Sequence, residues 1–216
     1  MKINKRRAFL LTAGSVLFLA FLYSALFIHM VKVPTGSMKN TILPGDRLAV
    51  HMLMGEIQRG DIVMFNYPED PAVRFVMRVI GLPGETIEVR GERVYINGVE
   101  LAEKRAEVKS QLPDDPSPLE IVSSNGEGNY SVSYYADEHT AEASVYESGR
   151  YAVKEPFQIP ANSYFVMGDN RDNALDSRFW GVVQRKMIIG KPFLIYWSDD
   201  LSTHTTRWGR MPSRLK

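Results

Sequence analysis

An uncharged apolar run from Ala8 to Ile28 separates a short basic start from a long polar remainder. As a helix, this run would be roughly 31 Å long, close to the roughly 30 Å hydrocarbon core of a bilayer. A cleaved signal peptide has a shorter apolar core and a small-residue exit, whereas Ile28-His-Met-Val-Lys32 follows here. A retained transmembrane anchor over residues 8–29 is therefore predicted. The basic residues that precede it are Lys2, Lys5, Arg6 and Arg7.

This basic cluster predicts the orientation of the anchor. Positive residues favour the cytoplasmic side, so residues 1–7 are expected in the cytoplasm and everything after residue 30 outside it. The chain is thus predicted to be a single-pass protein of the cell membrane, in contact with membrane lipid.

Most of the remaining chain is predicted to be β-structure. Short β-rich runs lie between turns containing Gly, Pro or Asp, and Asn97-Gly98 indicates a type I′ hairpin into residues 99–101. We expect an all-β domain over residues 31–101 and 151–200, closed by strands at 182–189 and 191–197, and a basic tail over residues 201–216. The early strands are expected at residues 47–51, 61–65, 74–80, 86–90 and 93–96.

Residues 102–150 differ in character from this domain. A short charged helix is expected at residues 103–109, a proline-rich linker at 112–118, and strands at 130–135 and 143–154. We interpret the block as an inserted β subdomain.

Composition excludes several classes of function. The chain has 26 basic and 25 acidic residues, so no strongly basic face for nucleic acid is expected. It has no cysteine, and its four histidines are scattered without metal-ligand spacing. Neither a metal nor another cofactor is predicted. The sequence leaves the oligomeric state open.

Ser37 is a candidate nucleophile. It lies in the turn Pro34-Thr-Gly-Ser-Met38, and at about 3.3 Å per residue it is at most about 30 Å from the predicted bilayer surface. A serine hydroxyl needs a base to take its proton and donors to stabilise an oxyanion. Thr35 and the Ser37 amide are plausible donors. Spacing alone nominates no histidine or aspartate as the base.

The stretch from Gly168 to Arg178 is too polar to be core. A solvated loop is one interpretation. The other is a rigid scaffold behind a site, in which Asp176 and Arg178 form an ion-pair network with a strand arginine such as Arg78.

Four stretches together resemble type I signal peptidase, the membrane-bound serine endopeptidase that cuts signal peptides from exported proteins. They occur in the family's order between residues 33 and 181. They are Pro34-Thr-Gly-Ser-Met38 with Pro44-Gly45-Asp46; Arg59-Gly-Asp-Ile-Val-Met-Phe65 with Tyr67-Pro-Glu-Asp70; Arg78-Val-Ile-Gly-Leu-Pro-Gly84; and Gly168-Asp-Asn-Arg-Asp-Asn173 with Asp176-Ser-Arg-Phe-Trp-Gly181.

The resemblance implies an all-β catalytic domain, a coiled β-sheet fold, outside the membrane, and a serine/lysine dyad. In that pattern Ser37 is the nucleophile and Thr35 supplies an oxyanion-hole hydroxyl. The residues implied as structural supports are Arg78, Asp169, Asp176 and Arg178.

The sequence departs from the family at the position of the general base. The dyad lysine belongs immediately before Arg78, and Met77 occupies that position. Methionine keeps the length and apolar stem of lysine but has no proton to exchange. Ala174 replaces a frequent serine, and Asn40 replaces a usual proline. No other lysine sits in an equivalent motif.

Three explanations for Met77 are open. It is an introduced substitution that disarms an active peptidase, a natural feature of a member that lost proteolysis and became a binding module, or a sign that another base operates. The chain as printed is predicted to be inactive.

The family cleaves after small side chains at the first and third positions before the cut. A shallow apolar pocket would exclude larger side chains, and an extended substrate would add as a strand beside residues 31–34. The predicted partners are exported preproteins, and a peptidase for one exported conjugation or pilus component is an alternative. The predicted substrate-binding residues are Val33, Pro34, Met64, Phe75 and Val76.

Overall fold

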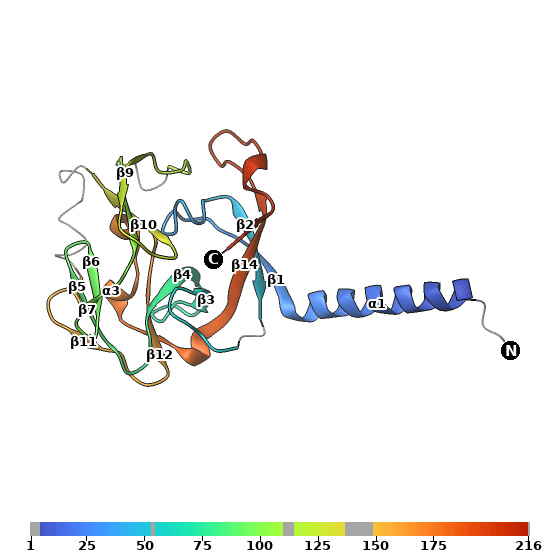
Figure 1. Cartoon of the computed structure of the whole chain (residues 1–216), viewed down its shortest axis with the longest axis horizontal. Coiled ribbons are helices and arrows are strands. Elements are labelled where there is room, and N and C mark those ends of the chain that lie inside the picture. Colours follow the sequence, from blue (N-terminus) through green and yellow to red (C-terminus); the bar gives the residue numbers. More distant parts are fainter. Residues whose placement is uncertain (1–4, 53–54, 110–114, 137–148, 216) are drawn as a thin grey trace.

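The structure is a computed structural model that describes residues 5–52, 55–109, 115–136 and 149–215. Helix α1 (Lys5–Phe27) extends as a rod from a body made of β-sheets, as Figure 1 shows. Its apolar side chains are largely exposed, with Phe9 at 70% and Leu17 at 71% of full exposure. Among the described residues, no helix has the length and apolar character required to cross a membrane.

The predicted transmembrane anchor over residues 8–29 is therefore not supported, and its bounds also differ. The helix begins at Lys5 and ends at Phe27. Ile28 and His29 belong instead to strand β1 (Ile28–Lys32), because their backbones pair with β2 (Asp46–His51).

An eight-stranded sheet forms the main body. Its order is β1-β2-β14-β3-β4-β12-β13, and β15 pairs with β14. All of its strand pairs are antiparallel. The members not yet given are β3 (Ile62–Asn66), β4 (Arg74–Gly81), β12 (Ser163–Met167), β13 (Val183–Gln184), β14 (Ile188–Ser198) and β15 (Ser213–Arg214).

A four-stranded sheet packs beside the main sheet. Its order is β11-β5-β6-β7, and its strands are β5 (Thr86–Arg90), β6 (Arg93–Ile96), β7 (Val99–Glu100) and β11 (Phe157–Gln158). Asn97 and Gly98 join β6 to β7 with φ angles of 51° and 81°. Positive φ at both turn residues is the geometry of the predicted type I′ hairpin.

The region after residue 101 forms a separate three-stranded sheet in the order β10-β8-β9, comprising β8 (Lys104–Val108), β9 (Ile121–Asn125) and β10 (Ser131–Tyr135). The helix predicted at residues 103–109 is wrong. Buried Ala106 and Val108 lie on either side of exposed Glu107, the alternation of a strand. The segment is the central strand of this sheet, and its backbone pairs with β10 on one side and β9 on the other. Residues 149–154 form no strand, and residues 143–148 lie outside the described part.

The closing strands are also rearranged. The stretch predicted as one strand over 182–189 is broken by a 3₁₀ turn, η2 (Arg185–Met187), and β14 then runs unbroken from Ile188 to Ser198. A second 3₁₀ turn, η1 (Arg171–Asn173), and a short helix, α3 (Ser177–Trp180), precede it. A third, η3 (Trp208–Arg210), lies in the tail. The division of the chain into domains stays a prediction.

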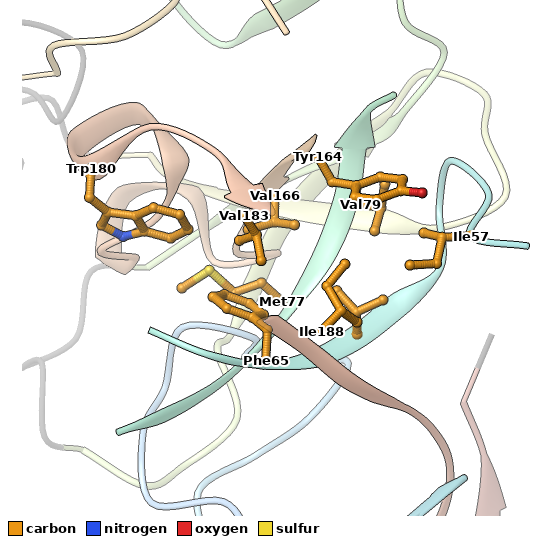
Figure 2. Close-up of a cluster of buried hydrophobic side chains, with 10 residues drawn as sticks. Ile57, Phe65, Met77, Val79, Tyr164, Val166, Trp180, Val183 and Ile188 are labelled. Carbon is orange, nitrogen blue, oxygen red and sulfur yellow. The ribbon is translucent and has the colours of Figure 1, made fainter. Parts of the chain in front are cut away.

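Met77 lies in one of the buried clusters that hold the main sheet together. Figure 2 shows it on the same side of β4 as Val79, near Phe65 and Trp180. Met77 is 2% exposed and Phe65 is fully buried. A methionine side chain fits this environment because it is flexible and apolar.

Candidate functional site

The Ser37 turn lies in a loop between β1 and β2 that is closed at its base. The Val33 amide donates to the Asp46 carbonyl at 2.9 Å, and the Gly45 amide donates to the Val33 carbonyl at 2.8 Å. Within the loop, the Lys39 amide donates to the Gly36 carbonyl at 3.0 Å and tightens the turn around Ser37. The side chain of Ser37 is half-buried.

The segment after β12 holds this turn from behind. The Asn170 amide donates to the Ser37 carbonyl at 3.0 Å, and its side-chain Nδ2 donates to the Gly36 carbonyl at 3.1 Å. Gly168 permits this approach, because a Cβ there would lie 2.5 Å from the Ser37 carbonyl oxygen and 2.4 Å from the Ala174 Cβ. Neither role was predicted, although both residues lie in the motif that carries the resemblance.

A buried ion pair connects this segment to β4. Arg78 donates to both carboxylate oxygens of Asp169 at 2.8 and 2.7 Å, and Asp169 also accepts from the Thr41 hydroxyl at 2.5 Å. Burial opposes the charge on Arg78, but its hydrogen bonds to Asp169 and the charge of Asp169 outweigh burial and raise its pKa. The pair joins the Ser37 loop to the strand that carries Met77.

The sequence predicted that Arg78, Asp176 and Arg178 form one ion-pair network. That prediction is wrong for Arg78. Asp176 and Arg178 do pair, at 2.8 Å, and both are fully buried. Arg78 instead reaches Asp169, because β12 pairs with β4 with Met167 opposite Arg78, so the next residues of the chain pass beside its guanidinium. The Asp176 carboxylate also caps α3 and accepts from the Gly168 amide at 3.1 Å.

One cavity brings together every residue that was predicted to act on a substrate. It has a volume of about 540 Å3, and Ser37, Thr35 and Met77 all line it. The predicted substrate-binding residues line it as well: Val33, Pro34, Met64, Phe75 and Val76. The predicted structural supports Arg78, Asp169, Asp176 and Arg178 are not among its lining residues.

A second hollow of about 640 Å3 shares Ser37 with the first. Pro34, Thr35 and Leu175 also line both hollows. The far part of the second hollow includes Asn173 and Ser202 and contains no charged residue. Ser37 therefore lies on the boundary between an apolar cavity and a more polar one, where a bound chain could pass from one to the other.

Lys39 is a buried lysine two residues after Ser37. It is 1% exposed, and its aliphatic stem packs against Gly36. Burial lowers its pKa, against the opposing charge of Asp115. The sequence offered no motif that marked Lys39. It lines neither of the two cavities that Ser37 lines, so its position is that of a support beneath the turn.

Within residues 5–52, 55–109, 115–136 and 149–215, no three His, Asp or Glu side chains are grouped closely enough to bind a metal ion.

Comparisons with known proteins show the family of the chain. The family model described as signal peptidase, peptidase S26, matches residues 6–197. Signal peptidase I of Pseudomonas aeruginosa is 31% identical over 226 residues, covering 91% of this chain and 75% of the relative. Signal peptidase I of Aquifex aeolicus is 32% identical over 208 residues, covering 80% of this chain and 77% of the relative.

Among solved structures, the crystal structure of a signal peptidase I from Enterococcus faecalis V583 is 27% identical, with a TM-score of 0.39. It covers 64% of this chain and 98% of the solved chain. The membership rests on the family model and on the sequence relatives. The chain belongs to the signal peptidase family, peptidase S26, and within it to the type I signal peptidases.

Proposed function

We propose that the chain has the site of an endopeptidase that removes signal peptides from exported preproteins, and that Met77 leaves this site able to bind but not to cleave. The observation that carries the proposal is that Ser37 and Met77 line one cavity. The nucleophile and the position of its base therefore face the same space, but only the nucleophile has reactive chemistry.

The reaction proposed for a site that contains a general base begins at Ser37. Its Oγ attacks the carbonyl carbon of the peptide bond, while a base removes the hydroxyl proton. The Thr35 hydroxyl and the Ser37 amide donate to the oxyanion. The base returns the proton to the leaving amine as the C–N bond breaks, and water then attacks the acyl ester and frees Ser37.

Met77 cannot perform the proton transfers. A thioether sulfur is a weak acceptor that does not hold a proton near neutral pH, whereas a buried lysine with a lowered pKa does. The Met77 side chain is buried in the same cluster as Phe65, so it keeps the packing that a lysine stem would have. Proton transfer by a positioned group typically contributes about 10²–10⁴-fold in rate, so most of the activity is lost without it.

An extended peptide is the substrate form that the cavity favours. β1 is the edge of the main sheet, and Val31, Lys32 and Val33 line the cavity. In β4, which also lines the cavity, only the residues from Arg78 onward pair with β12, so among the described residues Arg74–Val76 have no strand partner on that side. A strand inserted between these two edges would pair with main-chain groups and place alternate side chains in the apolar cavity.

We further propose that the protein works at a membrane surface. The exposed apolar side chains of α1, such as Phe9, Leu17 and Phe21, form a surface that water solvates poorly. α1 leads directly into β1, so lipid contact by the helix would keep the cavity near a membrane-bound preprotein. The single-pass topology stays a prediction from the sequence.

The test is cleavage of a purified preprotein by the full chain, by Met77→Lys and by Met77→Lys/Ser37→Ala, all in non-ionic detergent. We expect no detectable cleavage by the first and third proteins and cleavage at a site after small residues by the second. The Met77→Leu variant is the packing control and should not cleave the preprotein. If Met77→Lys folds, as shown by its circular dichroism and melting, yet does not cleave, the peptidase proposal is wrong.

The second candidate function is a membrane-anchored module that binds exported segments. It is favoured by the burial of Met77 in the core. Under this alternative Met77→Lys binds the preprotein without cleaving it. Cleavage by the unmodified chain would contradict both candidates and would point to another base, for which Lys39→Met is the variant to assay.

A further inference from the structure

The rim of the Ser37 cavity carries two positive charges that the proposed mechanism does not use. Lys32 lies at the end of β1 and Arg74 at the start of β4, and both line the cavity with exposed side chains. No acidic residue lines the cavity. The two basic residues come from the two walls between which an extended peptide is proposed to bind.

Neither charge is neutralised within the described part of the chain. The structure shows no hydrogen bond or ion pair from the side chain of Lys32 or Arg74 to any described residue. The carboxylates nearest to Arg74 along the chain form no ion pair with it. Glu69 accepts from the Tyr67 hydroxyl at 2.5 Å, and Asp70 accepts from the Ala72 amide at 3.1 Å.

The next charged residue of β4 and the one just before β3 do not compensate either. Arg78, the next charge along β4, lies in its own buried pair with Asp169. Asp61, just before β3, pairs with Lys191. The charged residues in the lining of this mostly apolar cavity are therefore both positive, and a peptide entering it meets both features.

We propose that Lys32 and Arg74 select peptides with an acidic side chain close to the two small residues that enter the cavity. This inference rests on the proposed function and adds the charge of the substrate to it. Small residues satisfy the apolar floor, and a carboxylate one or a few positions away reaches the rim. Exposed ion pairs of this type contribute modestly, so a preference of roughly two- to five-fold per charge is expected.

The experiment measures peptide binding by the full chain carrying Ser37→Ala, so that no cleavage can occur, in non-ionic detergent. Fluorescent peptides have Ala at the first and third positions before the cut. They differ only by Glu, Gln or Lys at the second, fourth or fifth position. We expect Glu to bind tighter than Gln, and Gln tighter than Lys, at one or more of these positions. The differences should shrink in 0.5 M salt, because the screening length falls to about 4 Å.

Lys32→Glu or Arg74→Glu alone leaves one positive and one negative charge at the rim and should abolish the preference. The double variant should reverse the order of the Glu and Lys peptides. The matched control is Lys104→Glu, an exposed charge on β8 that lines neither cavity. It should keep the original order. Fold is checked for each variant by its melting curve.

The outcomes separate the two proposals. Equal binding of the three peptides at every position, while the Gln peptide binds and Met77→Lys cleaves, overturns the charge preference and leaves the peptidase function standing. A preference that Lys104→Glu alters as much as the rim variants do also overturns it, because the effect would then be one of net charge. Absence of binding by every peptide overturns the charge preference, and together with no cleavage by folded Met77→Lys it overturns both.

Discussion

The backbone amide of Asn170 donates a hydrogen bond to the carbonyl oxygen of Ser37 at 3.0 Å. The Asn170 side chain adds a second bond to the Gly36 carbonyl at 3.1 Å. The turn that contains Ser37 is therefore held by a segment more than 130 residues away in the chain. The Oδ1 atom of Asn170 is buried and has no hydrogen-bond partner among the described residues.

Asn170→Ala should lower activity more than stability. The variant loses the bond to Gly36 but keeps the backbone bond to Ser37, so the turn loosens without detaching. In the Met77→Lys background we expect a roughly ten- to hundred-fold loss in kcat/KM, because small displacements of a nucleophile are costly. Preprotein cleavage measures this loss. Asn129→Ala, at an exposed position, should leave the rate unchanged.

Gly168→Ala should disturb the same contact sterically. The new methyl would lie 2.5 Å from the Ser37 carbonyl oxygen and 2.4 Å from the Ala174 Cβ, so one segment must move. We expect a loss of about 1–3 kcal/mol in the free energy of unfolding, the usual cost of overpacking. Urea denaturation measures it. Gly209→Ala is the control, since no atom lies within 4 Å of its added Cβ. Equal melting of both variants would contradict the close approach.

Arg78→Met should be among the most destabilising substitutions of a charged residue. It leaves the Asp169 carboxylate buried without its main partner, which typically costs about 3–5 kcal/mol. Adding Asp169→Asn should recover part of the loss, because the amide carries no charge to desolvate. Arg93→Met breaks the exposed pair with Glu100 and should cost much less. If both single variants unfold alike, the buried pair is not what holds the loop.

Lys39 should give the protein a measurable dependence of stability on pH. Burial lowers its folded pKa below the ordinary value of 10.5. Between the lowered value and 10.5, the unfolded chain binds a proton that the folded chain has released. The stability of the wild type therefore rises with pH in this window. Lys39→Met removes the effect. The unfolding free energy of the wild type minus that of the variant should therefore increase from pH 8 to pH 10. Parallel curves would show that the pKa of Lys39 is not lowered.

Several strands could be predicted because their signals are local. β5 matches its predicted range, and β2, β3 and β4 lie within one residue of theirs, since alternation and Gly/Pro turns act over a few residues. The segment at residues 103–109 misled the prediction because its charges suggest a helix. It became β8 because strands on both sides supplied hydrogen bonds. Pairing between distant segments overrides local preference.

The sequence by itself determined which positions are candidates for the site: a serine framed by Gly36, a methionine before Arg78, and a polar motif at residues 168–178. Only the tertiary structure decided which of them meet. It paired Arg78 with Asp169, buried Lys39 under the turn, and brought Lys32 of β1 and Arg74 of β4 into the lining of one cavity. Ion pairing, burial and cavity lining depend on distances between segments far apart in the chain, and periodicity and spacing do not contain those distances.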